Sequence, residues 1–150
     1  MIMNPTAIKH VVVDGHSLTL ESFVAIARYN ATVELAPSAL EAMKKSRALA
    51  EKIAAEGRVA YGITTGFGEF QKVAVPKEMS NQLSTNLILS HCTAAGEPYA
   101  DEIVRGMMLL RANALCGGVS GVRPILVEML LEMLNKGCLL YTSPSPRDCS

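Results

Sequence analysis

The stretch 101–137, DEIVRGMMLLRANALCGGVSGVRPILVEMLLEMLNKG, decides the fold. Its segments 101–116 and 125–135 carry apolar residues around most of a helical circumference, and three glycines in 117–121 break the chain between them. Helices that are apolar on nearly every side need covering neighbours. We therefore expect a multi-helix bundle completed by residues beyond this chain, by other subunits, or by both.

Two polar residues, Arg111 and Asn113, interrupt the first of these apolar helices. A long polar side chain inside an apolar helix needs a hydrogen-bonding partner. We expect the two side chains to bond loop backbone near the segment 117–124 and favour this structural role over a catalytic one.

Upstream, helices dominate, with one or two short strands near the N-terminus. The β-branched run 10–13 ends at an Asp-Gly turn and predicts a strand, and 32–35 predicts at most a second one. Between them, Ser17 or Thr19 caps a helix. A further helix of about 19 residues begins at Pro37, with capping-box spacing between Ser38 and Glu41, and ends before Gly57. Another runs from Lys77 to about Ser90. The fold class is mainly α.

Composition excludes several classes of protein. Of the 150 residues, 49% are hydrophobic and only 5% aromatic, which is typical of a helical protein with an aliphatic interior. Fourteen basic residues balance fourteen acidic ones without a dense basic cluster, so we expect no nucleic-acid or membrane-surface partner. No apolar run reaches the roughly 18 to 20 residues of a membrane span. The four cysteines form no CxxC pair and the N-terminus has no leader pattern, which indicates free thiols and a cytoplasmic location.

Motifs for phosphate, metal or hydrolase sites are missing from the sequence. Neither GxGxxG nor GxxxxGK[ST] occurs, and no His/Cys/Asp/Glu cluster has the spacing of metal ligands. The glycine-flanked serine in 117–121 lacks the strand-to-helix register of a hydrolase elbow. We expect neither a metal nor a nucleotide.

The best candidate for chemistry is the segment 61–68, YGITTGFG, in which a tyrosine precedes three glycines. Glycines let a backbone adopt positive φ and let a ligand approach closely, and a tyrosine can transfer protons once its pKa is lowered. From spacing alone, an ordinary surface loop with a packed aromatic remains the alternative. His91 is a second candidate, with Ser90 and Asn86 as polar neighbours; a capped, buried histidine is the alternative there.

Four sequence blocks favour the catalytic over the structural interpretation, because they resemble a known family. YGITTGFGEF (61–70), NLILSHCTAAGEP (86–98), MMLLRANALCGGVSGVRP (107–124) and LLEMLNKG (130–137) occur in this order in the N-terminal region of histidine ammonia-lyases and their aromatic amino-acid relatives. The chain resembles this family over roughly 11–137. The resemblance implies a helical bundle of the fumarase and aspartase type, a homotetramer, and an amino acid as the small-molecule substrate.

The resemblance also implies site residues. Tyr61 matches the family's essential loop tyrosine, a base or proton carrier in the elimination of ammonia, and His91 matches a histidine that lines the substrate pocket. We include with them, as pocket residues, Ser90 and Gly68, and, as the tyrosine loop, Gly62, Thr64, Thr65, Gly66 and Phe67. The electrophile of the family is a methylidene-imidazolone prosthetic group formed from an internal Ala-Ser-Gly, which these 150 residues do not contain.

The pair Ser90-His91 bears on the substrate. Histidine ammonia-lyases carry Ser-His at this place, tyrosine-selective relatives usually His-Leu, and phenylalanine-selective relatives Phe-Leu. A polar pocket suits an imidazole, because buried hydrogen-bonding groups reject substrates that leave them unpaired. The resemblance therefore favours conversion of histidine to urocanate, the first step of histidine degradation. A tyrosine or phenylalanine ammonia-lyase or aminomutase stays open, since some bacterial tyrosine aminomutases also carry Ser-His. A non-catalytic helical interaction module is the remote alternative.

The last residues differ in character. The segment 138–150, CLLYTSPSPRDCS, has no helical period, and 138–148 look like an in-frame translation of a transposase adapter used in sequencing libraries. We therefore predict that 1–137 is the N-terminal region of an ammonia-lyase and that 138–150 is a non-native tail; a natural disordered tail is the alternative. Without an Ala-Ser-Gly of its own, the chain alone is expected to be inactive.

Overall fold

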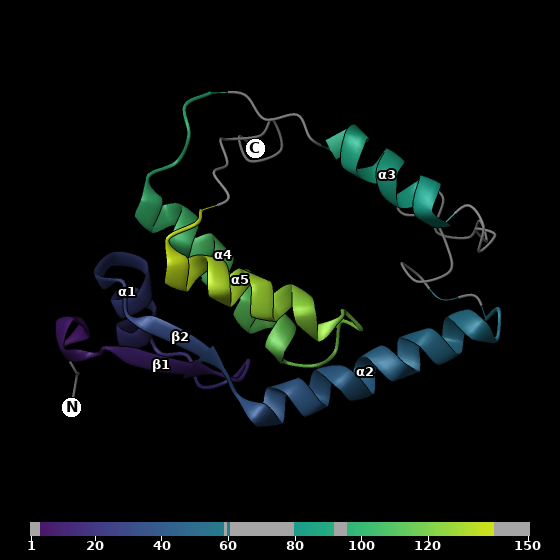
Figure 1. Cartoon of the computed structure of the whole chain (residues 1–150), viewed down its shortest axis with the longest axis horizontal. Coiled ribbons are helices and arrows are strands. Elements are labelled where there is room, and N and C mark those ends of the chain that lie inside the picture. The colour runs from purple at the N-terminus through teal and green to yellow at the C-terminus, as the bar shows by residue number, and fades with distance from the viewer. Residues whose placement is uncertain (1–3, 59, 61–79, 92–95, 140–150) are drawn as a thin grey trace.

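A computed structural model describes residues 4–58, 60, 80–91 and 96–139 (Figure 1). Its elements, in chain order, are the 3-10 turn η1 (Pro5–Ala7), β1 (His10–Val13), α1 (Leu20–Tyr29), β2 (Thr32–Leu35), α2 (Pro37–Ala55), α3 (Ser80–His91), α4 (Asp101–Cys116) and α5 (Pro124–Lys136). The expected fold class, mainly α with two short strands near the N-terminus, is confirmed. The predicted start of α3, residues 77–79, lies outside the described residues.

The N-terminal part is a β-α-β unit. β1 and β2 pair in parallel, with His10 opposite Thr32 and Val13 opposite Leu35, and α1 connects them. Of the two expected caps for α1 it is Thr19 that acts, because its side-chain oxygen accepts a hydrogen bond from the backbone of Ser22 at 3.2 Å.

Helix α2 has the predicted length, but its start differs in one detail. Pro37 occupies the first helical position, so the N-cap is Ala36, which offers no side-chain oxygen. The predicted capping box is therefore wrong: Ser38 already lies inside the first turn, and Glu41 pairs with Lys44 at 2.9 Å instead. Proline at the first position stabilises the start without a capping side chain, since its missing N–H would have been unpaired anyway.

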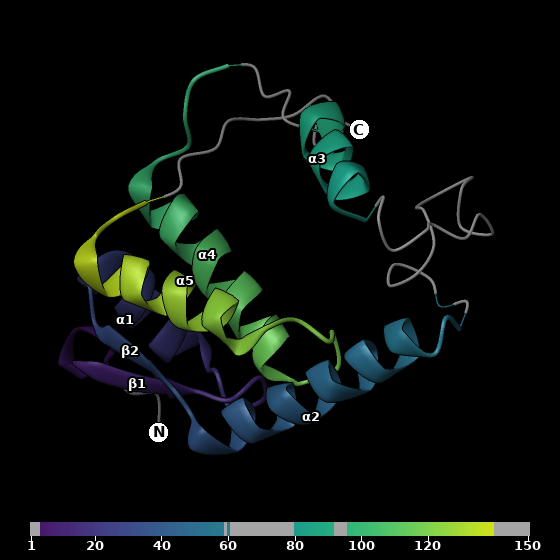
Figure 2. The same cartoon turned by 45° about the vertical axis from the view of Figure 1, so that its right-hand side comes forward.

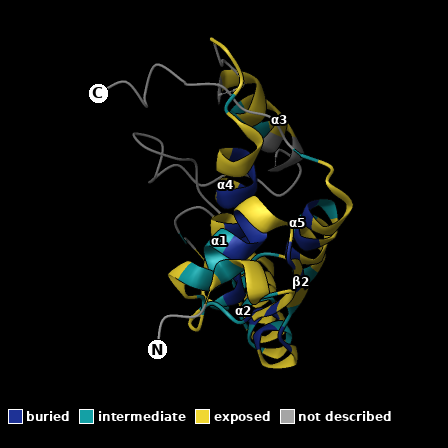
Figure 3. Ribbon diagram, turned by 90° about the vertical axis from the view of Figure 1, so that its left-hand side faces the viewer, coloured by how far each residue is buried: buried dark blue, intermediate teal, exposed yellow. Residues whose placement is uncertain are grey.

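Helix α4 is the centre of the packing. It contacts α1, α5 and α2, and Figure 2 shows it running beside α5. The buried core joins the inner faces of these helices to β1 and β2, as the dark blue ribbon in Figure 3 shows. Its largest fully buried side chains are Val13, Ile26, Met43, Val104, Leu109, Cys116, Val127 and Leu134. Apolar side chains also remain exposed on α4 (Ile103, Met107, Leu110) and α5 (Ile125, Leu126, Met129).

One charged side chain lies inside this core. Arg105 of α4 is 6% exposed, and its guanidinium donates to the backbone carbonyl of Ile26 from Nε (3.1 Å) and Nη2 (2.9 Å) and to that of Leu134 from Nη1 (3.0 Å). Ile26 and Leu134 lie in the last turns of α1 and α5, where the helix dipole favours a positive charge. Burial lowers the pKa of Arg105, and the charge of Asp101 opposes this shift. Arg105 therefore binds the C-terminal ends of two helices to a third.

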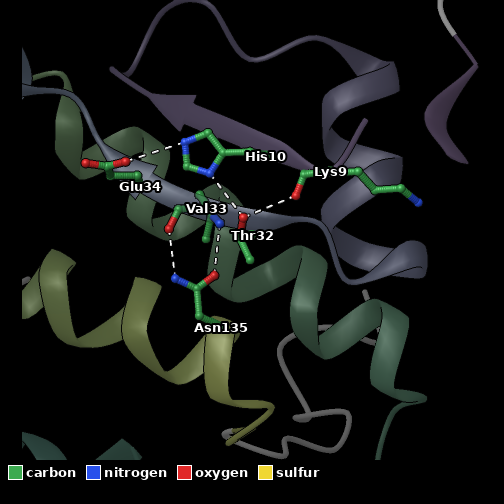
Figure 4. A network of polar contacts seen from close by, with 6 residues as sticks. All are labelled: Lys9, His10, Thr32, Val33, Glu34 and Asn135. Atoms are coloured by element: carbon green, nitrogen blue, oxygen red, sulfur yellow. Dashed lines mark hydrogen bonds and ion pairs between the residues drawn. The ribbon is translucent and has the colours of Figure 1, made fainter. Parts of the chain in front are cut away.

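Asn135 closes one edge of the small sheet (Figure 4). Its Nδ2 donates to the carbonyl of Val33 at 2.8 Å, and its Oδ1 accepts from the Val33 N–H at 2.9 Å. The amide thus takes the place of a third strand beside β2 and fixes the last turn of α5 against it. On the exposed face, His10 lies 3.0 Å from the hydroxyl of Thr32 and 3.4 Å from the carboxylate of Glu34.

The turn after β1 is organised by Asp14. Its carboxylate accepts from the backbone N–H groups of His16 and Ser17, each at 2.8 Å, and from the Ser17 hydroxyl at 2.9 Å. These bonds lower the pKa of Asp14 from 3.8 to about 2, the His16 N–H having the largest effect. A carboxyl group with a depressed pKa stabilises the folded state fully above its unfolded pKa and loses that effect as the pH falls through its folded value.

We expect Asp14→Ala to lower the melting temperature at neutral pH and to flatten the loss of stability between about pH 4 and about pH 2. Thermal denaturation across this range checks both effects. Asp14→Asn keeps an acceptor oxygen but not the charge, and should fall between alanine and the wild type. A wild-type pH profile in Asp14→Ala would show that the turn contributes nothing.

Candidate active site

The predicted tyrosine loop lies outside the described residues. This holds for Tyr61, Gly62, Thr64, Thr65, Gly66, Phe67 and Gly68, whose roles stay predictions. The structure does describe the approach to it: α2 ends at Ala55, Gly57 follows with a φ of +65°, and Ala60 is half-buried.

The other predicted pair, Ser90 and His91, occupies the last two positions of α3. The Ser90 side chain is exposed, and its hydroxyl donates to the carbonyl of Leu87 at 2.9 Å. Asn86 accepts from Gln82 at 2.8 Å, one turn closer to the helix start. The described bond of Asn86 thus points toward the helix start. Nothing further is described of the His91 side chain.

Helix α3 presents apolar surface beside this pair. Ile88 is 67% and Leu89 65% exposed. Figures 1 and 2 both show α3 standing apart from α1, α4 and α5. Exposed apolar side chains of this size form a surface that other parts of a protein commonly cover.

The glycine segment 117–121 joins α4 to α5, so it has no strand before it and the exclusion of a hydrolase elbow is confirmed. It lies against α2: a Cβ added to Gly118 would come within 2.7 Å of the Cβ of Ala42, and one added to Gly121 within 3.0 Å of the Cβ of Ala50. The alanine-rich face of α2 is thus explained by close contact with this loop.

The two polar residues of α4 differ in what they contact. Asn113 bonds loop backbone near the segment 117–124, as expected: its Oδ1 accepts from the N–H of Gly15 at 3.1 Å, and a Cβ on Gly15 would lie 2.6 Å from the backbone nitrogen of Gly117. Arg111 is exposed and borders a groove of about 540 Å³ between α4 and α5, beside Met107 and Leu130. No described hydrogen bond links Arg111 to the segment 117–124.

Other features of the described residues offer no second reaction centre. A groove of about 420 Å³ between α1 and α4 is lined mainly by apolar side chains, with the ion pair Arg28–Glu102 (2.7 Å) at its rim. Burial raises the pKa of the Cys116 thiol to about 11, and the charge of Asp14 adds to this, so the group stays protonated and is a poor nucleophile. No cluster of three or more metal-ligating side chains occurs within these residues, and none of the described helices is long and apolar enough to cross a bilayer.

Comparisons with known proteins agree with one another. The family model for aromatic amino acid lyases matches residues 18–140. Among curated proteins, a histidine ammonia-lyase of Alkaliphilus metalliredigens is 47% identical over 129 residues, which are 86% of this chain and 25% of the relative. One of Caldanaerobacter subterraneus is 50% identical over 128 residues, 85% of this chain and 25% of the relative. The chain thus spans about a quarter of the length of the curated relatives it matches.

Solved structures show the same fold. A tyrosine aminomutase from Streptomyces globisporus matches with a TM-score of 0.80 and 38% identity, over 85% of this chain and 24% of that one. A histidine ammonia-lyase from Trypanosoma cruzi matches with a TM-score of 0.74 and 36% identity, over 84% of this chain and 24% of that one. Since the family model covers most of the sequence and the described helices superimpose on those of solved members, the chain belongs to the aromatic amino acid lyase family.

Proposed function

We propose that the complete protein is a histidine ammonia-lyase, which converts L-histidine to urocanate and ammonia, and that this chain supplies its N-terminal region. One observation carries the proposal: eight curated relatives, 43–50% identical to the chain, are all histidine ammonia-lyases. Because the chain spans about a quarter of their length, the activity belongs to the complete protein.

The reaction breaks the C–N bond at Cα of histidine and a C–H bond at Cβ, and forms the double bond of urocanate. Tyr61 is proposed to accept the proton, which requires a phenol whose pKa is lowered toward the working pH. Ser90 and His91 are proposed to face the imidazole of the substrate, at the end of α3. Hydrogen-bonding groups at that place favour histidine over substrates with an apolar ring, which would leave them unpaired.

A methylidene-imidazolone, when present, supplies an electrophile that activates the substrate for loss of ammonia. The residues of this chain do not fit its formation, because no Ala-Ser-Gly occurs among the 150. The group would have to come from another part of the complete protein or from a neighbouring subunit. We expect no metal.

We further propose a homotetramer in the cytoplasm. The exposed apolar side chains of α4 and α5 support burial against other parts of an assembly. The four cysteines form no CxxC pair, which supports a reducing compartment. Light scattering of the purified complete protein and fractionation of its source cells test these two points.

The proposal is tested by expressing the complete protein and supplying L-histidine, L-tyrosine and L-phenylalanine separately. We expect urocanate and ammonia from histidine at a kcat/KM well above the values for the other two. A higher kcat/KM for tyrosine or phenylalanine would reject histidine as the substrate but not the membership of the family.

The second candidate is a tyrosine aminomutase. The match to the Streptomyces globisporus enzyme, with a TM-score of 0.80 and 38% identity, favours it. In the same assay it predicts an isomer of tyrosine with its amino group moved, and no accumulation of free ammonia. Chromatography of the tyrosine reaction separates the two outcomes.

The pair at the end of α3 allows a direct test of specificity. We expect the double variant Ser90→His/His91→Leu to lower kcat/KM for histidine by about 10²-fold or more, because the imidazole of the substrate loses hydrogen-bonding partners. Its kcat/KM for tyrosine should fall far less or rise. Gln82→Ala, more than two turns earlier on the same helix, is the control. An unchanged ratio of the two values would remove Ser90 and His91 from the substrate pocket.

A further inference from the structure

Helix α4 leaves one face uncovered, and that face is apolar. Beyond the acidic first two positions of the helix, the exposed side chains are Ile103, Met107, Leu110, Arg111 and Ala114. The three large apolar ones are each about half exposed, and the other positions of α4 are buried or partly buried. The outward face of a helix in a soluble protein is normally polar. A face on which four of five side chains are apolar therefore belongs to an interface.

The spacing of these side chains is that of a contact between two helices. Ile103, Met107, Leu110 and Ala114 follow one another in steps of four, three and four residues. A second helix packs against such a seam at a small crossing angle of about 20°. Next to the seam lies the groove of about 540 Å³ between α4 and α5, two helices that run side by side (Figure 2). The occupant that fits this surface is a helix lying along α4.

Arg111 adds a requirement for charge. Among the described residues that line the groove it alone is charged, the others being Val104, Met107, Met108, Leu110, Ala114 and Leu130. Arg111 forms no hydrogen bond or ion pair with any part of the chain that the structure describes. The acidic residues of α5, Glu128 and Glu132, each lie two positions from Leu130 and so on the opposite side of that helix from the groove. A helix that covers Arg111 removes it from water, which is costly unless a carboxylate pairs with it.

We propose that a helix from the part of the complete protein beyond residue 137 packs along α4 and carries a carboxylate that pairs with Arg111. The chain spans about a quarter of the length of its curated relatives, so about three-quarters of the complete protein is available to supply this helix. A segment of the same polypeptide is held near the groove by its covalent connection, whereas a second copy has to be recruited from solution. The inference does not depend on which amino acid the complete protein converts.

The ion pair is tested by crosslinking in the complete protein. Arg111→Lys keeps the positive charge and supplies an amine, which a carbodiimide joins as an amide to a carboxylate in contact with it. We expect the introduced lysine to be joined to an Asp or Glu beyond residue 137, which peptide mass spectrometry locates. The product should run at the mass of a single chain on a denaturing gel. Arg123→Lys, the same change at the exposed residue before α5, is the control and should not be joined to that carboxylate.

Three results of this experiment would overturn the inference in an Arg111→Lys protein that melts at the wild-type temperature. They are a crosslink only to carboxylates within 1–137, a product with the mass of two chains, and no crosslink from the introduced lysine. The second result would assign the face to another copy of the protein.

The wild-type protein provides a measurement that does not require the variant to fold. Met107 is about half exposed on the uncovered face, and peroxide oxidises accessible methionines. Under a packed helix, Met107 of the complete protein should be oxidised at least about tenfold more slowly in the folded than in the urea-unfolded state, because oxidation then requires local opening. Equal rates in the two states would show that nothing covers this face, and the inference would be wrong.

Discussion

Tyr61→Phe in the complete protein is expected to lower kcat for urocanate formation by about 10²- to 10⁴-fold, the usual contribution of a positioned group that transfers a proton. The phenyl ring keeps the size and the packing of the side chain and removes only the hydroxyl. KM for histidine should therefore change much less than kcat. Initial rates over a range of histidine concentrations measure both constants.

A matched control is available on α1. Tyr29 is 51% exposed at the end of that helix, so Tyr29→Phe makes the same chemical change at the surface. It should leave kcat and KM at their wild-type values. A Tyr61→Phe enzyme with wild-type kcat would show that another group accepts the proton, and the role assigned to the loop would be wrong.

The largest effect on stability is expected from Arg105→Met. The variant keeps much of the apolar bulk but removes both hydrogen bonds that Arg105 donates to the carbonyl of Ile26, inside the core. The carbonyl of Leu134 loses its bond from Arg105 but keeps the one from the N–H of Gly137 at 3.3 Å. An unsatisfied buried polar group costs about 1–3 kcal/mol, so we expect a loss of about this size. Relief from burying a charge offsets part of it. Native-state hydrogen exchange in the last turns of α1 and α5 measures the free energy of local opening.

The control is Arg28→Met. Arg28 pairs with Glu102 at 2.7 Å, but its side chain is 59% exposed, and surface ion pairs contribute about 0–1 kcal/mol. The same substitution should therefore have little effect there. Equal losses in the two variants would mean that the buried guanidinium does not hold the helix ends together.

Much of the fold could be predicted from the sequence, because its signals are local. Pro37 and Gly57 bracket α2, the β-branched runs give β1 and β2, and Gly137 ends α5 in a left-handed conformation. The capping box failed because Pro37 takes the first helical position and Ala36 the N-cap, so Ser38 lies two residues too late to cap.

Long-range partners could not be predicted. In the sequence, Arg105 looks like any charged residue on a helix. Its hydrogen-bond partners are the carbonyls of Ile26 and Leu134, which lie 79 and 29 residues away along the chain. The partner of Asn135 is the backbone of Val33, 102 residues away, and that of Asn113 is Gly15, 98 residues away. A sequence does not mark which backbone groups will be partners, so it could indicate loop backbone near 117–124 for Asn113 but not Gly15 itself.

For the candidate site, the chemistry of the residues alone did not separate a catalytic role of Tyr61 and His91 from an ordinary structural one. What favoured catalysis was the order of four blocks along the chain, and membership of the aromatic amino acid lyase family agrees with it. The structure then adds the place of Ser90 and His91 at the end of a helix with exposed apolar side chains.

The most direct test of the account compares the complete protein with residues 1–150 alone, both supplied with L-histidine, by following the absorbance of urocanate. The account predicts sustained urocanate formation by the complete protein and none by residues 1–150, which carry the proposed proton acceptor but no Ala-Ser-Gly. Urocanate from residues 1–150 alone, or none from the complete protein, would contradict it.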